Sequence, residues 1–163
     1  MKKLALIALA AASSAVAAEV PITGTVASKC VITTDTVGIY GNPSPSILST
    51  AAGDGGVEPV IRFDIISANH YKAVIETPNY FSASPALNDV VNWAGSVTVG
   101  EVSDAQMSAF EPAKRVYNNV TEYDLTVAGS AWFNISSQAD YGYDKSFPSG
   151  TYSAVVNAEC VAL

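Results

Sequence analysis

Few side chains in this sequence have a type and spacing that could support catalysis. His70, in Ala-Asn-His-Tyr, is the only histidine, and no serine, cysteine or carboxylate motif beside it suggests a catalytic triad. The sequence has no Gly-x-Ser-x-Gly, no phosphate-binding glycine-rich loop and no His-Glu-x-x-His. We therefore interpret His70 as a turn or surface residue and predict that the protein is not an enzyme.

The carboxylates are scattered along the chain, so spacing alone does not identify a pair for acid–base catalysis. Those in or beside predicted strands are Asp64, Glu76, Asp89 and Glu101. A hydrolase that uses two carboxylates needs both at one cleft, and any fold can bring distant acids together. Because three of the four adjoin predicted turns, we interpret them as solubility and turn residues.

Acidic loops offer oxygen ligands for calcium at two places. These are Asp54, in Gly-Asp-Gly-Gly, and the pair Asp140 and Asp144. Neither loop has the dense carboxylate spacing of a known calcium loop, and Asp and Gly are ordinary turn residues. A structural zinc site needs more ligands than two cysteines and one histidine supply. The sequence therefore predicts neither a metal site nor a cofactor.

Aromatic side chains are the remaining candidates for a binding surface. Tyr141 and Tyr143 stand close together in a predicted loop, where they could form an adhesive patch. Trp93 and Trp132 lie in predicted strands, where such rings usually fill a core, and a carbohydrate platform needs the ring exposed. We take Tyr141, Tyr143 and Trp93 as the candidate binding surface.

The sequence contains only two cysteines, Cys30 and Cys160. An even pair in a small exported domain usually forms a disulfide. We predict a first strand over Val20–Ile32 and a last strand over Thr151–Leu163. Since side chains alternate between the two faces of a strand, both cysteines fall on the apolar, buried face. A disulfide between them would join the first strand to the last.

The N-terminal residues 1–18 have the three parts of a secretory signal. The positive pair Lys2-Lys3 precedes the apolar run Leu4–Ala12, and Ala15-Val16-Ala17 offers the small residues that signal peptidase requires. The apolar run is shorter than the roughly 20 residues of a membrane anchor. We predict cleavage, one domain over residues 19–163 without a membrane span, and an exported location in the periplasm, at the cell surface or outside the cell.

The charge balance argues against one class of partner. Only 14% of the residues are charged and the formal net charge is −7, which becomes −9 when the two signal-peptide lysines are removed. An acidic surface repels phosphate backbones, so we expect no nucleic-acid partner. A strand-rich chain with few charges is well suited to edge-to-edge association.

Short stretches of alternating apolar residues, separated by Gly, Pro, Asn, Asp and Ser, predict an all-β fold with two antiparallel sheets in a sandwich. Between the terminal strands we expect strands near Val60–Ile66, Tyr71–Glu76, Val90–Val99, Arg115–Asn118, Glu122–Val127 and Ala131–Ser136. The expected loops are Gly41–Gly56, Thr77–Asn88, Gly100–Lys114 and Asp140–Ser149, with a turn at Ala128-Gly129-Ser130. The third loop holds one helical turn, Asp104–Phe110, capped by Ser103.

Two stretches resemble subunits of chaperone–usher fimbriae and spore-coat-U-like proteins. Gly24–Ile32 is similar to the family's opening strand, a run of small residues and valine that ends in cysteine, and Tyr40–Pro43 resembles the turn that follows it. Phe147–Val156 resembles the Pro-x-Gly-Thr-Tyr entry into the final strand. The resemblance implies an immunoglobulin-like sandwich that is exported as a fimbrial subunit.

The resemblance also implies a fold completed by the N-terminal extension of a neighbouring subunit. A first strand that begins near Val20 leaves few residues for such an extension, which favours a self-complete sandwich, so both forms stay open. We expect a non-catalytic structural or adhesive subunit whose partners are copies of itself, other surface subunits and a periplasmic chaperone. The alternatives are a virion-associated structural protein and a secreted sugar- or protein-binding module that uses the loops Gly41–Gly56 and Thr77–Asn88.

Overall fold

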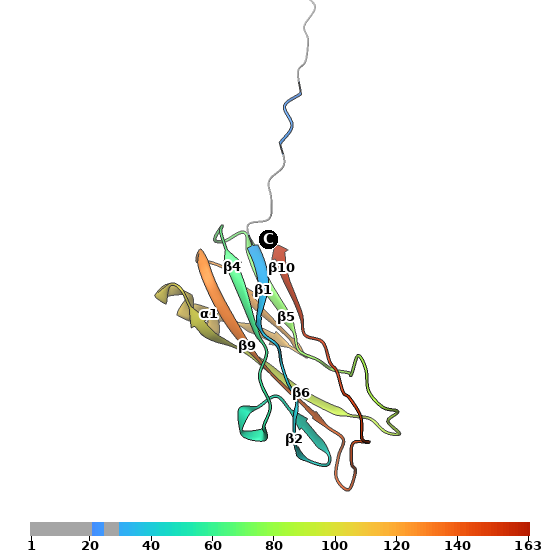
Figure 1. The fold of residues 1–163 in the computed structure, drawn as a ribbon. Coiled ribbons are helices and arrows are strands. Elements are labelled where there is room, and N and C mark those ends of the chain that lie inside the picture. The colour runs from blue at the N-terminus through green and yellow to red at the C-terminus, as the bar shows by residue number, and fades with distance from the viewer. Residues whose placement is uncertain (1–20, 25–29) are drawn as a thin grey trace, which may run out of the picture.

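The computed structural model describes residues 21–24 and 30–163, so the predicted signal segment 1–18 lies outside the described residues. The described part consists of strands with three short helical segments (Figure 1). The strands are β1 (Cys30–Thr36), β2 (Gly41–Ser44), β3 (Ile47–Ser49), β4 (Val60–Ile65), β5 (Tyr71–Glu76), β6 (Asn92–Val102), β7 (Arg115–Tyr117), β8 (Val120–Asp124), β9 (Gly129–Asp140) and β10 (Asn157–Ala162). The helical segments are the 3₁₀ helices η1 (Ala52–Asp54) and η2 (Ala105–Ala109) and the α-helix α1 (Phe110–Ala113).

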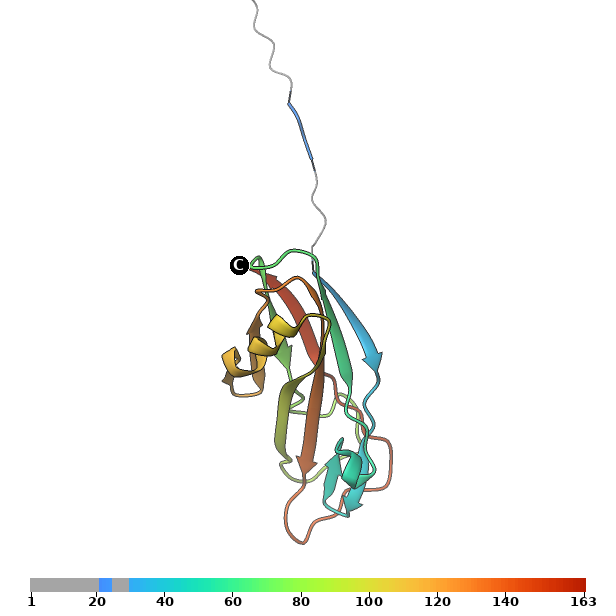
Figure 2. The ribbon, with the colours of Figure 1, turned by 90° about the vertical axis from the view of Figure 1, so that its left-hand side faces the viewer.

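The strands form two antiparallel sheets (Figures 1 and 2). In the first sheet the order is β1-β4-β9-β3-β2, and β6 pairs with the other edge of β9. The 12-residue strand β9 is long enough to pair with β4 along its first half and with β3 at its end. The second sheet has the order β10-β5-β8-β7. The predicted fold class, an all-β antiparallel sandwich of the immunoglobulin-like type, is confirmed in these two sheets and in their disulfide.

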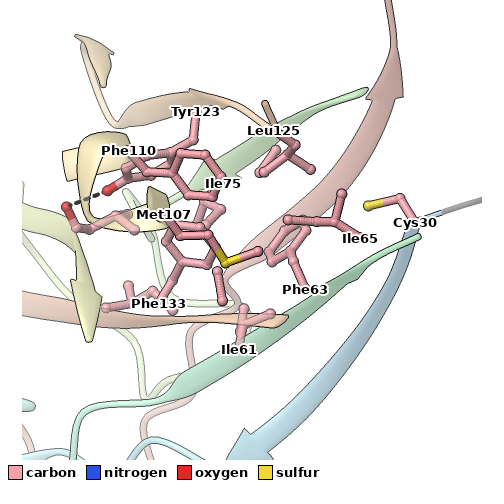
Figure 3. Packing of buried hydrophobic residues seen from close by; sticks show 14 residues of the cluster. Cys30, Ile61, Phe63, Ile65, Ile75, Met107, Phe110, Tyr123, Leu125 and Phe133 are labelled. Atoms are coloured by element: carbon pink, nitrogen blue, oxygen red, sulfur yellow. Dashed lines mark hydrogen bonds between the residues drawn. The ribbon is translucent and has the colours of Figure 1, made fainter. Parts of the chain in front are cut away.

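The hydrophobic core lies between the two sheets and is built from alternate residues of their strands (Figure 3). In β9, for example, Ala131, Phe133 and Ile135 are fully buried, while the residues between them face outward. The Tyr123 hydroxyl, from the second sheet, donates a hydrogen bond to the Val97 carbonyl oxygen of the first sheet at 3.0 Å. The largest fully buried side chains are Tyr123, Phe63, Phe133, Ile75, Met107, Leu125, Ile135 and Val97.

The disulfide forms as predicted and joins the edges of the two sheets. Cys30 opens β1, Cys160 lies in β10, and their Cα atoms are 6.2 Å apart, a usual separation for a disulfide. Among the helices of the described residues, none has the length and apolar character needed to cross a membrane.

The predicted first strand, Val20–Ile32, is wrong at its N-terminal end. Pro21–Gly24 form no strand, Val20 and residues 25–29 lie outside the described part, and β1 as described covers Cys30–Thr36. The described ladder starts where β4 ends, since Cys30 pairs with Ile65, the last residue of β4. The last strand is likewise shorter than predicted, since Asn157 pairs with Glu76, where β5 ends.

Most internal strands lie where the alternating pattern predicts them, but the segment Gly41–Gly56 is not a plain loop. It contains β2, β3 and η1, and β3 pairs with the end of β9. The predicted turn at Ala128-Gly129-Ser130 is also displaced, because Gly129 already begins β9 with a positive φ of 136°.

The helical turn after Ser103 is present, although its cap differs from the prediction. Asp104 caps η2, because its carboxylate accepts a hydrogen bond from the Gln106 N–H at 2.8 Å. The Ser103 hydroxyl oxygen instead accepts a hydrogen bond from the Ser130 N–H at 2.7 Å, which ties the turn to the start of β9.

Candidate functional site

The sandwich is open along one side, between β1 and β10. In the described part of the chain, β1 pairs only with β4 and β10 pairs only with β5, so each strand has one edge without a ladder partner. The two strands lie side by side and run in opposite directions, joined at one end by Cys30–Cys160 (Figure 1). Unpaired strand edges present N–H and C=O groups to any strand that approaches them.

A groove continues this open edge beyond the disulfide. One wall is formed by Thr36, the last residue of β1, and by Val37 and Gly38, which follow it. The other wall is the segment Ala154–Val156, which precedes β10, and the groove has a volume of ≈ 270 Å³. Both walls are mainly apolar, so the groove is suited to apolar side chains.

The polar groups on the floor of the groove are already paired with each other. The Tyr40 hydroxyl lies 2.8 Å from the Ser137 hydroxyl oxygen, and burial raises the pKa of the Tyr40 phenol. The Thr50 hydroxyl oxygen accepts a hydrogen bond from the Ser137 N–H at 2.8 Å. The floor therefore presents neither a charge nor an unsatisfied donor that would select a charged ligand.

The walls of the groove and the core behind them are incompletely covered. Val37 is 75% exposed and Val155 is 54% exposed. Ile32 and Val156, which pack against the core, are only partly buried. Ala154 and Val155 make no backbone hydrogen bond within the described residues, although the neighbouring Ser153 N–H donates to the Ala83 carbonyl oxygen at 2.8 Å. A strand placed in this groove would cover apolar surface and pair free backbone groups.

The aromatic residues predicted as a binding surface do not form one patch. Tyr143 is 92% exposed, whereas Tyr141 is only 7% exposed, stacked on Phe147 with a centroid separation of 5.1 Å. The Tyr141 hydroxyl also accepts a hydrogen bond from the Asn88 N–H at 3.0 Å. Trp93 is partly buried, with its ring 4.7 Å from that of Phe81. Packing thus draws the Tyr141 ring into an internal aromatic cluster, while Tyr143 stays on the surface.

His70 and the predicted carboxylates are not brought together. His70 is exposed in the turn before β5, and within the described residues its side chain makes no hydrogen bond or ion pair to a carboxylate. Asp64 accepts hydrogen bonds from Arg62 and Ser130 on the outer face of the first sheet. Glu76 accepts from two asparagine amides on the second sheet.

The two calcium candidates lie in ordinary local structure. Asp54 belongs to η1, and the Asp140 carboxylate accepts a hydrogen bond from the Gly142 N–H at 2.8 Å, as in a common turn. Over residues 21–24 and 30–163, no group of three or more His, Cys, Asp or Glu side chains lies close enough to hold a metal ion.

Sequence reasoning did not identify the groove, although one signal of it is present. Ala154-Val155-Val156 interrupts the alternation of the last strand, because Val155 is apolar at a position that should face solvent. Comparison with models of known protein families, with curated proteins and with solved structures finds no match to this chain.

Proposed function

We propose that this protein is a non-catalytic structural or adhesive subunit of an exported surface assembly, and that the next subunit attaches at the open edge between β1 and β10. The observation that carries the proposal is this edge itself, where free backbone groups flank an apolar groove and the core is incompletely covered. Monomeric sandwiches usually block such edges, whereas assemblies use them for strand addition.

The occupant that we propose is the N-terminal segment of a neighbouring copy. In residues 20–28 every second residue is apolar or small, in the order Val20, Ile22, Gly24, Val26 and Ser28. Such a strand would turn its apolar side toward the groove and its threonines toward solvent. In the described part of this stretch, Pro21–Gly24 form no strand, and Ile22 is 97% exposed.

Two further properties agree with an exported subunit. The disulfide suits an oxidising compartment, and closing the open edge protects apolar surface that a free subunit would leave exposed. A periplasmic chaperone that held this edge before assembly would serve the same purpose.

The proposal is tested by separating the donor segment from the groove. Ile22→Asp places a charge in the segment, and Val155→Arg places one in the wall of the groove. Val116→Arg is the matched control, because Val116 is 61% exposed on β7, at the far edge of the second sheet. The full chain would be exported with its own signal and examined by light scattering and electron microscopy.

We expect filaments or ladders from the wild type and the control, and monomers from each of the other two variants. Mixing the two monomeric variants is the decisive step, since one retains an intact groove and the other an intact donor. A mixture that yields a one-to-one dimer supports strand exchange. A wild-type chain that stays monomeric at high concentration overturns the proposal. So does a chain that carries both substitutions and still polymerises.

A further inference from the structure

A second recess lies on the outer face of the first sheet, away from the core. It runs across four neighbouring strands, with Asp35 from β1, Val60 from β4, Trp132 and Asn134 from β9, and Glu101 from β6. Its volume is ≈ 450 Å³. We call this recess the Trp132 trough.

Trp132 faces outward because its neighbours face inward. Ala131 and Phe133 are fully buried, so the alternation of β9 places the indole ring on the outer face, where it is partly exposed. On the outer face the ring leaves part of its apolar surface in water, where a ligand can contact it.

The ring is held in place by polar neighbours. The indole N–H of Trp132 donates a hydrogen bond to the Asp35 carboxylate at 2.6 Å. The Arg62 guanidinium lies 5.9 Å from the ring centroid, and its Nη1 is 3.6 Å from the same Asp35 carboxylate. A ring fixed before a ligand arrives loses little conformational entropy on binding.

The space beside the ring comes from a glycine at an irregular point of β6. The register between β6 and β9 shifts between Val99 and Val102, and Gly100 lies in this interval. A Cβ atom at Gly100 would approach the Asn134 amide to 2.9 Å. The missing side chain therefore keeps the trough open between Asn134 and the strand edge.

The polar groups around this space have capacity for a ligand. The side chains of Thr36, Glu101 and Asn134 make no hydrogen bond or ion pair with any residue that the structure describes. A carboxylate accepts hydrogen bonds, an amide both donates and accepts, and a hydroxyl does either. Such a mixture beside an aromatic face matches a ligand with many hydroxyls and one apolar side, which is the character of a pyranose ring.

We propose that the Trp132 trough binds a neutral oligosaccharide, with the C–H face of one sugar ring on the indole and its hydroxyls on Asn134 and Glu101. Charge selects against acidic sugars, because the Glu101 carboxylate has no cationic partner among the described residues and Arg62 is already neutralised by Asp35 and Asp64. The net charge of −7 acts in the same direction. This site is separate from the open edge and would give the assembled protein its adhesive character.

Calorimetric titration of the full chain tests the proposal. Cellohexaose, chitohexaose and lacto-N-neotetraose serve as neutral probes, and sialyllactose and a heparin fragment serve as anionic ones. Trp132→Ala should weaken binding of a neutral probe by about tenfold or more, because stacking supplies much of the affinity. Gly100→Leu, which fills the trough and leaves Trp132 in place, should have the same effect, and Trp93→Phe is the matched control that should leave binding unchanged.

Circular dichroism and the assembly assay would show that each variant still folds and associates, which keeps this test independent of the edge proposal. Binding of a neutral probe that both trough variants lose and the control retains supports the site. No binding to any neutral probe, binding only to anionic probes, or a loss caused by Trp93→Phe instead of Trp132→Ala would each overturn it.

Discussion

At the scale of single residues, the outer face of the second sheet is organised around Glu122. This side chain accepts hydrogen bonds from the Lys72 ammonium at 2.7 Å and from the Tyr117 hydroxyl at 2.8 Å. Arg115 lies nearby and pairs mainly with Asp124. The hydrogen bond from Lys72, and then that from Tyr117, lower the pKa of Glu122 below its ordinary value of 4.5.

A lowered pKa makes the contribution of Glu122 to stability dependent on pH. The carboxylate stabilises the fold fully above pH 4.5, and this stabilisation is lost as the pH falls through the lower pKa of the folded protein. We therefore expect Glu122→Gln to lower the urea midpoint at neutral pH, and the difference from wild type to shrink at strongly acidic pH.

Glu159→Gln is the control for this prediction. Glu159 is exposed on β10, and its carboxylate makes no hydrogen bond or ion pair within the described residues. Its neutralisation should leave the midpoint almost unchanged. A constant difference between Glu122→Gln and wild type at every pH would contradict the assigned role of the charge.

At the scale of elements, two glycines pack the corner formed by β2, β3 and η1. A Cβ atom at Gly56 would lie 2.3 Å from the Ser49 carbonyl oxygen, and one at Gly41 would lie 2.1 Å from the Asp54 carbonyl oxygen. Both contacts are with backbone, which cannot move aside as a flexible side chain does. These close approaches let the segment fold onto itself, and β3 then pairs with β9.

Gly56→Ala should therefore destabilise the protein by about 1–3 kcal/mol, the usual cost of overpacking. Gly53→Ala is the matched control, because a Cβ atom at Gly53 meets nothing within 4 Å. Denaturant unfolding of both variants measures the difference. Equal stabilities for the two would show that the corner adjusts freely and that the close packing has no energetic role.

At the scale of the whole molecule, one disulfide holds the two sheets together at the open edge. Cys30 and Cys160 are 130 residues apart in sequence, and each lies in an edge strand of a different sheet. Because no ladder joins β1 to β10 in the described part of the chain, the disulfide and the core carry this contact.

The double substitution Cys30→Ser and Cys160→Ser should lower the free energy of unfolding by about 4–5 kcal/mol in the chain-entropy model for so long a loop. Guanidinium unfolding of the variant and of the wild type, each with and without reductant, measures this loss. Reductant should change the wild type and leave the variant unaffected. An unfolding midpoint that is the same in all four samples would show that the core alone holds the edge.

Much of this architecture follows from local sequence. The alternation of Tyr71–Glu76 and Val60–Ile66 predicts both strands and their buried faces, because side-chain period depends only on neighbouring residues. The cysteine pairing also follows, since a chain with two cysteines offers only one intramolecular pair. Trp132, by contrast, was expected to fill the core as strand aromatics usually do, whereas the structure places it on the outer face, between the buried Ala131 and Phe133.

Other features depended on contacts between distant residues. The three-residue strand β3 forms because β9 offers it an edge. Burial of Tyr141 required Phe147 and Asn88. Sequence by itself determined which residues alternate, where most strands lie and which cysteines pair. Only the tertiary structure decided which strand edges stay unpaired and which side chains meet in the groove and the trough, because these depend on partners that local periodicity does not specify.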